Sequence, residues 1–588
     1  MKLKVFVFVS FLIILSAPAQ VVYDLENNDQ ISMINAISGL NNGDDGISRA
    51  QAPIIAVDLN NNGILDYITA MSGSDFLYIY FDQQDFTEQY YYPHEGPNLI
   101  ITGAAYLGSA FASGDFNGDG IADVLVGAYR ELGDGEAFVI FGSESLPTTG
   151  FENIYDLANV RLAFSGFSGN QDFFGLTLST ADMNNDGYDE IIVGAPVIWS
   201  FSGRGSVYII YGSLNLPSVI NTRTEADVII EGGGVWEHIG RHLDKGDYNN
   251  DGYEDLVFVS AHWPGPGANG ERGKAWILFG SNSLPSYFNT SQTYSQITGF
   301  SGQNQSDEMA HTATGDINGD GIDDLLLSSL KYDAPISYLS TNNFGKIYIN
   351  YGPITPGENY DDVEGFNSQT KIYPHPEDLT TSQTYMYIGS RFGQSLNIND
   401  INGDGYDDIL IGAPGYSRWP ATGSQTNEGA AFLILGGNYT NQILYQDSQY
   451  MQFIASNEVD SSRNVEFGRS VSFLRINEEN KLHVAIKDLA RPWVYLFDIT
   501  STLNLNETLK DKIYLIYPNP TKDYIRLITD RSELSSYQLF NITGEIIEKQ
   551  IITSNSTKIY LANLPSSVYL LRVFKNNHIV KSFKIIKN

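Results

Sequence analysis

Cysteine is absent from this chain of 588 residues. Disulfide bridges, thiolate nucleophiles and cysteine metal sites are therefore excluded, and stability must come from packing, hydrogen bonds or bound metal ions. Basic residues are also scarce, with 34 Lys and Arg against 69 Asp and Glu, so the formal net charge is −35. Such an acidic surface repels nucleic acid and anionic lipid and attracts cations.

Long apolar runs are missing after the N-terminus, and no later segment approaches the roughly 20 apolar residues that span a bilayer. The N-terminus itself reads MKLKVFVFVSFLIILSAPAQ, with Lys2 and Lys4 before an apolar run and small residues at 17–19. This combination is typical of a secretory signal peptide over residues 1–19, and the run is too short for the alternative, a membrane anchor. We therefore expect an exported protein.

Familiar catalytic signatures are lacking too. The sequence contains no GxSxG elbow, P-loop or HExxH motif, so it offers no recognisable nucleophile elbow, phosphate-binding P-loop or catalytic zinc site. We found no other catalytic constellation, and we predict that the protein is not an enzyme.

What is abundant is a nine-residue acidic stretch, such as DINGDGYDD from Asp400, which occurs in six copies. A degenerate seventh copy follows Phe467, with Arg475 in place of the first Asp and His483 in place of the last acidic residue. Short β-branched or aromatic runs, bounded by Gly, Pro and Asn, flank each copy and predict strands. Seven such units favour an all-β, seven-bladed β-propeller over an open solenoid or separate sandwiches.

Oxygen-bearing side chains occupy positions 1, 3, 5 and 9 of each copy, glycine at position 6 permits a sharp turn, and a backbone carbonyl is expected at position 7. Such hard ligands suit Ca²⁺, with Mg²⁺ ranked second. We predict up to six structural Ca²⁺ ions, of which the one at Asp58 is bound most weakly because position 5 is Asn62. The predicted metal residues are Asp58, Asn60, Asn62, Ile64, Asp66, Asp115, Asn117, Asp119, Ile121, Asp123, Asp182, Asn184, Asp186, Tyr188, Glu190, Asp247, Asn249, Asp251, Tyr253, Asp255, Asp316, Asn318, Asp320, Ile322, Asp324, Asp400, Asn402, Asp404, Tyr406 and Asp408.

EF-hands and dockerins begin with a similar loop, but both continue into a helix, and an EF-hand places Glu at position 12. Position 12 of the last full copy is Ile411, inside an expected strand. A calcium switch also needs a bistable helix pair, which the sequence does not indicate. We therefore interpret the calcium as structural.

Phe-Gly precedes the acidic loop and Gly-Ala-Pro follows it at 174–196 and 392–414. With these motifs, roughly residues 21–500 resemble the FG-GAP repeats of integrin α-subunit propellers. The resemblance implies a propeller over 20–500 with calcium loops on its lower face and ligands docked on its upper face. No inserted adhesion domain or leg domains are present, so integrin-type signalling is not implied. Val22-Tyr23-Asp24-Leu25 resembles the stretch 154–157 of a middle unit, and we expect the N-terminal segment to supply the outer strand of the last blade.

The C-terminal segment 512–588 follows a linker at 501–511 and differs in charge. Residues 507–588 hold 12 Lys and Arg against 7 Asp and Glu, whereas residues 20–506 hold 20 against 62. Its alternating apolar residues predict a small β-sandwich. The stretches YPNP, FNITGE and LPSSVYLLRV resemble the type A sorting domain of the type IX secretion system of Bacteroidetes-type bacteria. That resemblance implies recognition by the secretion machinery during outer-membrane translocation, and usually removal afterwards; the alternative is an accessory binding sandwich.

The loops after the Gly-Ala-Pro positions vary in length and carry aromatic and Arg side chains, which can stack on sugars or anchor a protein partner. We expect a cell-surface or secreted adhesion protein that binds an extracellular glycan or protein, with no nucleic-acid partner. The alternatives are that these side chains pack between blades, and that the scaffold is an extracellular polysaccharide hydrolase or lyase. The candidate ligand-binding residues are Trp199, Arg204, Trp263, Arg272, Tyr416, Arg418 and Trp419.

Overall fold

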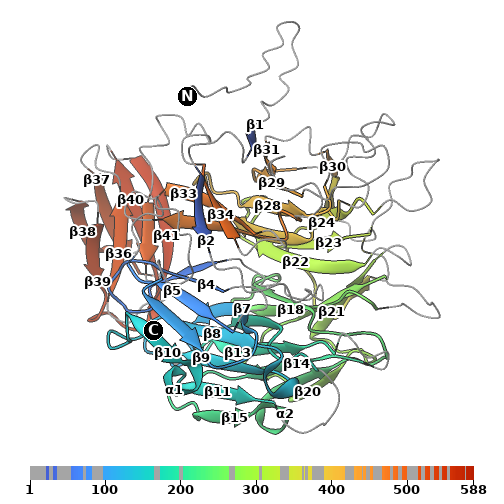
Figure 1. The fold of residues 1–588 in the computed structure, drawn as a ribbon. Coiled ribbons are helices and arrows are strands. Elements are labelled where there is room, and N and C mark those ends of the chain that lie inside the picture. The colour runs from blue at the N-terminus through green and yellow to red at the C-terminus, as the bar shows by residue number, and fades with distance from the viewer. Residues whose placement is uncertain are drawn as a thin grey trace, which may run out of the picture. The chain divides into compact units, whose positions relative to one another are not determined.

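The computed structural model is built almost entirely of β-strands (Figure 1). The predicted signal peptide and the predicted linker lie outside the residues that it describes. Contacts divide the chain into a large unit, which ends at Ile499, and a second unit, whose main segment is Thr500–Asn588. The described residues are 21–24, 31–35, 54–70, 75–82, 97–164, 172–197, 203–263, 272–302, 308–331, 343–360, 363, 369–373, 390–416, 429–439, 441–444, 450–454, 466–476, 481–487, 493–499, 514–517, 524–529, 535–541, 546–552, 556–575 and 578–587.

Among the described residues, seven sheets belong to the large unit, and each begins with an innermost strand that is followed in the chain by antiparallel partners. The first three sheets, written from the innermost strand outward, are β3 (Ile55–Val57), β4 (Asp66–Ala70), β5 (Leu77–Tyr80), β6 (Leu99–Thr102) and β10 (Gly150–Asn153); β7 (Leu107–Gly114), β8 (Asp123–Ala128), β9 (Glu136–Ile140), β11 (Val160–Ala163) and β15 (Val219–Asn221); and β12 (Thr177–Ala181), β13 (Glu190–Ala195), β14 (Ser206–Ile210), β16 (Val228–Glu231) and β20 (Tyr287–Asn289).

The remaining four sheets repeat this order. They are β17 (His242–Gly246), β18 (Asp255–Ser260), β19 (Lys274–Leu278), β21 (Ile297–Ser301) and β25 (Asn359–Tyr360); β22 (Met309–Gly315), β23 (Asp324–Ser329), β24 (Lys346–Asn350), β26 (Gln369–Tyr373) and β30 (Asn441–Leu444); β27 (Ser395–Asn399), β28 (Asp408–Ala413), β29 (Ala430–Ile434), β31 (Tyr450–Ile454) and β1 (Val21–Asp24); and β32 (Ser470–Ile476), β33 (Lys481–Lys487), β34 (Trp493–Asp498) and β2 (Ile31–Asn35). Short helical turns lie between strands at η1 (Glu131–Gly133), α1 (Ile154–Leu157) and α2 (Thr222–Glu225).

The fifth strand of a sheet comes from the next unit along the chain and pairs in parallel with the fourth strand. In the sixth sheet that strand is β1, which carries the predicted repeat segment from Val22. The outer strand of the seventh sheet is β2, antiparallel to β34. The N-terminal segment therefore does complete the last sheet, as expected, but the strand that does so is Ile31–Asn35.

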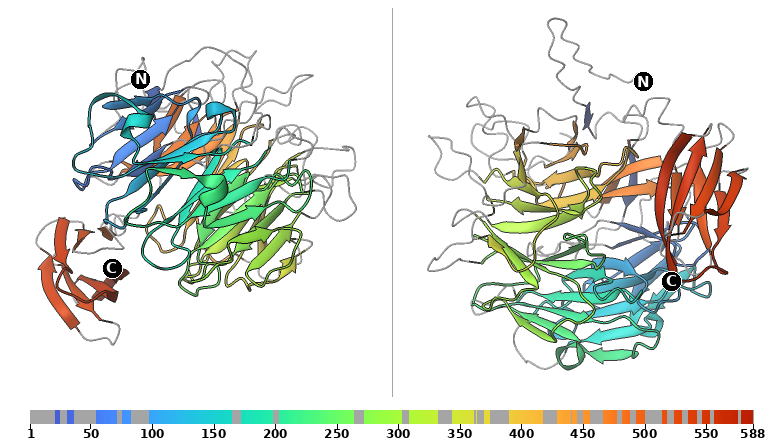
Figure 2. Two further views of the ribbon diagram at one scale, coloured as in Figure 1. Left: turned by 90° about the horizontal axis from the view of Figure 1, so that it is seen from below. Right: turned by 180° about the vertical axis from the view of Figure 1, so that it is seen from behind.

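Each innermost strand contacts the innermost strand of the next sheet, and the order of contacts returns from β32 to β3. The junction between the seventh and first sheets contains an apolar cluster that includes Tyr67, Tyr78 and Leu496. Two hydrogen bonds also cross it, from the Ser472 hydroxyl to the Ile54 carbonyl and from Lys487 Nζ to the Ala70 carbonyl. The views in Figures 1 and 2 show these sheets following one another in chain order, as the propeller prediction requires.

The second unit contains two antiparallel sheets of its own. Its core includes Ile525, Leu539, Leu571 and Ile585, and around Leu539 and Leu571 buried residues alternate with half-buried ones along the strand. This alternation is what the sequence predicted for a small sandwich. The strands are β35 (Tyr514–Tyr517), β36 (Tyr524–Thr529) and β39 (Ser556–Tyr560), and then β38 (Ile546–Ile552), β37 (Ser535–Phe540), β40 (Ser567–Lys575) and β41 (His578–Lys587).

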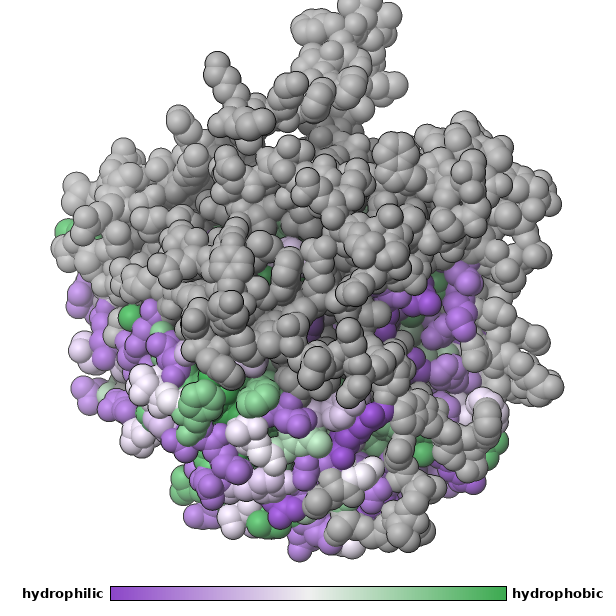
Figure 3. Space-filling view, in the orientation of Figure 1, coloured by the Kyte–Doolittle hydropathy of each residue, from purple (hydrophilic) through white to green (hydrophobic). Residues whose placement is uncertain are grey.

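On the face shown in Figure 3, the described surface is largely hydrophilic and apolar residues form scattered patches. Within the described ranges, no helix is both long enough and apolar enough to cross a membrane.

Candidate metal-binding loops and the opposite face

The six acidic copies join the innermost strand to the second strand of the first six sheets. Position 9 is the first residue of the second strand in every copy. These six position-9 side chains are completely buried, although all are carboxylates, and a buried carboxylate is costly unless hydrogen bonds or a cation satisfy it. They are Asp66, Asp123, Glu190, Asp255, Asp324 and Asp408.

The loop backbone explains two features of the repeated sequence. The glycine at position 6 has φ between +84° and +91° in all six copies, a conformation that glycine adopts readily. Position 4 is also left-handed, with φ between +56° and +75°, and it is Asn or Gly in every copy, the residues that tolerate this region best. Position 4 is not a predicted ligand, and this backbone conformation explains why Asn or Gly recurs there.

In the Asp182 loop the side-chain oxygens accept hydrogen bonds from the loop's own backbone. The Asp182 carboxylate accepts from the N–H groups of Asp186 and Gly187, both at 3.0 Å. Asn184 accepts from Asp186 N–H at 2.9 Å, and Asp186 accepts from Tyr188 N–H at 3.0 Å. The same bonds recur in the loops at Asp58, Asp247 and Asp316.

The position-9 carboxylate fastens the loop to the sheet. In the fourth sheet, Asp255 accepts from Tyr248 N–H at 3.0 Å and from Gly280 N–H at 2.8 Å. Glu190 accepts from Met183 N–H at 2.7 Å, but its buried Oε1 has no hydrogen-bond partner. A buried carboxyl oxygen that accepts no hydrogen bond is the kind of group that a bound cation would satisfy.

Burial is the main reason that the pKa values of these carboxyl groups are high, and repulsion from other loop carboxylates adds to it. The pKa is raised to about 9 for Glu190, about 8 for Asp255 and about 7 for Asp324. It is raised to about 6 for Asp66 and for Asp182. A divalent cation at the loop would lower these pKa values, because it favours the ionised carboxylates.

The donor set of the loops fits Ca²⁺. Within the described ranges, no three Asp, Glu or His side chains form a ready metal-holding group, and the loop carboxylates accept hydrogen bonds from backbone N–H groups instead. An ionised carboxylate has about four lone-pair sites, so those bonds leave acceptor capacity for a metal. All side-chain donors are oxygens, which Ca²⁺ prefers. The unpartnered Oε1 of Glu190 supports this assignment most directly.

Acidic residues at position 8 of four loops were missed in the sequence, although they stand beside the last predicted ligand. They are Asp189, Glu254, Asp323 and Asp407, and each accepts a hydrogen bond from the preceding loop in the chain. The signal was their recurrence at one position. Their partners lie 72 to 91 residues away, so the sequence could not identify them.

The candidate ligand residues that the structure describes lie at the opposite edge of the sheets, since alternate connections between antiparallel strands emerge at opposite ends. Tyr416 does not fit the predicted role: it is 4% exposed and its ring packs edge-on against Phe432 in a core cluster. Trp263 is half-buried against a core cluster, with Lys274 Nζ 5.0 Å from its ring centre. Arg272 is half-buried and Arg204 is exposed. The candidates Trp199, Arg418 and Trp419 lie outside the described residues.

Trp236, which is not among the predicted ligand-binding residues, lies at this same edge, in the connection that enters β17. Its side chain is 41% exposed and its backbone is left-handed, with φ at +71°. Buried Glu237 fixes the connection by accepting from the N–H groups of Gly233 and Gly234 at 3.0 and 2.8 Å. Trp236 N–H donates to the Gly203 carbonyl at 2.9 Å, which brings this backbone beside Arg204.

Comparison with protein families finds FG-GAP repeats at residues 107–140, 174–210 and 392–434. It also finds a secretion system C-terminal sorting domain at residues 515–588. Both resemblances stated from the sequence are thereby confirmed.

Among curated proteins, phosphatidylinositol-glycan-specific phospholipase D of Rattus norvegicus is 24% identical over 457 residues, which is 65% of this chain and 52% of that protein. Integrin alpha-8 of Gallus gallus is 31% identical over 189 residues, which is 30% of this chain and 16% of that protein. The chain thus spans about half the length of the Rattus norvegicus and Mus musculus phospholipases and 16% of the integrin.

Two solved structures are similar at low sequence identity. One is PorZ, a surface component of the type-IX secretion system of Porphyromonas gingivalis, with a TM-score of 0.32, 11% identity, and coverage of 89% of this chain and 58% of that one. The other is the exotype rhamnogalacturonan lyase YesX, with a TM-score of 0.36, 8% identity, and coverage of 80% and 76%.

Proposed function

We propose that this protein is a calcium-stabilised binding protein. It carries FG-GAP repeats and a type IX sorting domain, and the sorting domain indicates export to the cell surface or secretion. Its acidic loops hold structural Ca²⁺, and the opposite edge of its sheets binds an extracellular glycan or protein without turning it over. The C-terminal domain is the part that the type IX machinery recognises.

The observation that carries the calcium assignment is the repeated burial of a carboxylate at position 9, including the unpartnered Oε1 of Glu190. In six copies the chain places a group of high desolvation cost at the same point of the same loop. When bound, Ca²⁺ would neutralise the loop carboxylates and stabilise the folded state. The residues that would hold it are those at positions 1, 3, 5 and 9, with the backbone carbonyl of position 7.

The binding assignment is supported by the contrast between the two edges of the sheets. The loop edge is built from one repeated motif, whereas the connections at the opposite edge differ in sequence from unit to unit. Trp236 is the described residue there that is best suited to a contact, because its ring is exposed and its backbone is fixed by Glu237. A rigid aromatic side chain loses little conformational entropy on binding.

The test uses the full chain on a glycan array and in pull-downs of extracellular proteins, together with turnover assays on polysaccharides. We expect saturable binding and no turnover, and we expect Trp236→Ala to weaken binding at least tenfold. Tyr287→Ala is the matched control, because Tyr287 is 46% exposed but lies on the outer strand β20. Depolymerisation of any polysaccharide would favour the alternative, a hydrolase or lyase on the same scaffold.

A further inference from the structure

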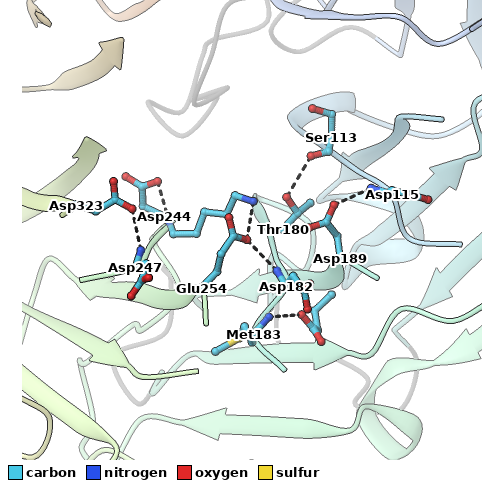
Figure 4. A network of polar contacts seen from close by, with 12 residues as sticks. Ser113, Asp115, Thr180, Asp182, Met183, Asp189, Asp244, Asp247, Glu254 and Asp323 are labelled. Atoms are coloured by element: carbon cyan, nitrogen blue, oxygen red, sulfur yellow. Dashed lines mark hydrogen bonds and ion pairs between the residues drawn. The ribbon is translucent and has the colours of Figure 1, made fainter. Parts of the chain in front are cut away.

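The carboxylates at position 8 join neighbouring sheets at the acidic loops (Figure 4). Asp189 accepts the backbone N–H of Asp115, the first residue of the preceding loop, at 2.7 Å. In the same way Glu254 accepts from Asp182 N–H at 2.8 Å, and the last two pairs, Asp323 with Asp247 and Asp407 with Asp316, are also 2.8 Å long. Four successive junctions, from the second sheet to the sixth, therefore carry the same bond.

A backbone bond runs the other way at three of these junctions. Asp189 N–H donates to the Asp115 carbonyl at 3.1 Å, and the equivalent bonds from Glu254 and Asp407 measure 3.3 and 2.9 Å. Each such pair of residues is thus doubly linked. In the fourth sheet Lys245 Nζ also contacts the Glu254 carboxylate at 2.8 Å, which holds that side chain toward Asp182.

The junction between the first and second sheets shows that the backbones can approach closely without a position-8 carboxylate. A Cβ on Gly142 would meet the carbonyls of Ala122 and Leu59, just as one on Gly212 would meet those of Asp189 and Phe116. The backbone segments of neighbouring sheets therefore approach each other about equally closely at Gly142 and at Gly212. Position 8 of the second loop is Ala122, however, so this junction lacks the acceptor.

We infer that the position-8 carboxylates are positioning residues that couple metal binding between neighbouring loops. This inference rests on the proposed Ca²⁺ binding. Each carboxylate belongs to one loop and holds the backbone of the first metal-binding residue of another, so ordering either loop favours the ordered form of both. Such reciprocal preference is positive coupling between sites.

Terbium, a luminescent substitute for Ca²⁺, can report on one loop. Tyr253 occupies position 7 of the Asp247 loop, so the luminescence lost on Tyr253→Phe isolates that site. We expect Asp323→Ala to weaken terbium binding at the Asp247 loop about fivefold or more, given typical coupling between sites. Asp323→Asn, which keeps an acceptor oxygen without the charge, should weaken it less.

A second junction repeats the measurement with different residues, which guards against one variant failing to fold. Glu254→Gln is read at the Asp182 loop through Tyr188, its position-7 residue. The control for loss of one negative charge is Asp156→Asn, at an exposed position of α1. We expect the control to leave both sites within twofold of the parent protein.

The outcomes separate the two proposals. If the parent protein binds neither terbium nor Ca²⁺, the calcium proposal fails and the coupling fails with it. If the parent binds but Asp323→Ala and Glu254→Gln leave the neighbouring loops unchanged, the coupling alone is overturned. Weakening only at the altered residue's own loop would also overturn it, because the inferred effect crosses the junction.

Discussion

The junction between the seventh and first sheets differs from the four successive junctions that run from the second sheet to the sixth. The latter carry acidic loops on both sides and a carboxylate that bridges them. The seventh unit has Arg475 and His483 where the loop acids would be, and its junction with the first sheet is an apolar cluster crossed by bonds from Ser472 and Lys487. Both kinds of junction also contain apolar clusters, so they differ in their polar bonds. A repeated carboxylate crosses four junctions, whereas a hydroxyl and an ammonium group cross the junction between the seventh and first sheets.

Removing Ca²⁺ is expected to have the largest effect on this comparison. Each site held at 100 times its dissociation constant contributes about 2.7 kcal/mol to folding stability, so a chelator should lower the melting temperature of the large unit substantially. Amide hydrogen exchange should lose protection first at the acidic loops and later at β33 and β34. Calorimetry in Ca²⁺ and in chelator checks the first part, and equal melting temperatures would contradict structural calcium.

Substituting a buried position-9 acid compares two loops of different donor content. Asp255→Ala leaves the N–H groups of Tyr248 and Gly280 without their acceptor, which costs about 1–3 kcal/mol for each buried group. Asp66→Ala removes the same kind of bonds, from Leu59 and Asp82.

The two variants should lose similar stability in chelator. In Ca²⁺ the loss should be larger for Asp255→Ala, since the Asp58 loop has fewer carboxylates. Chemical denaturation in both conditions measures the difference, and equal losses in Ca²⁺ would contradict the ranking of the sites.

The pH dependence should reverse when the metal is removed. In the metal-free protein the pKa values of Glu190, Asp255 and Asp324 are about 9, 8 and 7, whereas unfolded carboxyl groups titrate near about 4. The folded state therefore holds protons that the unfolded state has lost, and stability should fall as the pH rises from about 4 to about 8.

With Ca²⁺ present, protons compete with the metal for the same oxygens, so the gain in melting temperature from Ca²⁺ should shrink as the pH falls from 8 to 5. Melting curves across this range in Ca²⁺ and in chelator provide the check. A gain independent of pH would mean that these acids are not ligands.

Ala122→Asp is expected to have the smallest effect and to make the first junction resemble the others. The new carboxylate can accept the backbone N–H of Asp58, and one hydrogen bond to a charged group contributes about 1.5–3 kcal/mol at most. Added repulsion should reduce this gain, so we expect a small rise in melting temperature in Ca²⁺ and none in chelator. A rise of equal size in chelator would show that the bond acts without the metal.

Much of the acidic loop could be predicted because the residues that define it lie close together in the sequence. Glycine at position 6 and oxygens at alternate positions within nine residues define the turn, and the strand runs on either side of it were correctly placed. Trp263 and Tyr416 show where local reasoning ends. Both are aromatic residues in variable loops, and only their packing against neighbouring strands showed that one is half-buried and the other buried.

By itself, the sequence determined the strand units, the acidic turns, the sorting domain and the export class, because each depends on residues close together in the chain. The tertiary structure decided which strand completes the last sheet, that Trp236 rather than Tyr416 is exposed, and that Asp189, Glu254, Asp323 and Asp407 bridge adjacent loops. These features depend on pairs of residues brought together across sheets. Spacing within one unit carries no information about a partner in the next.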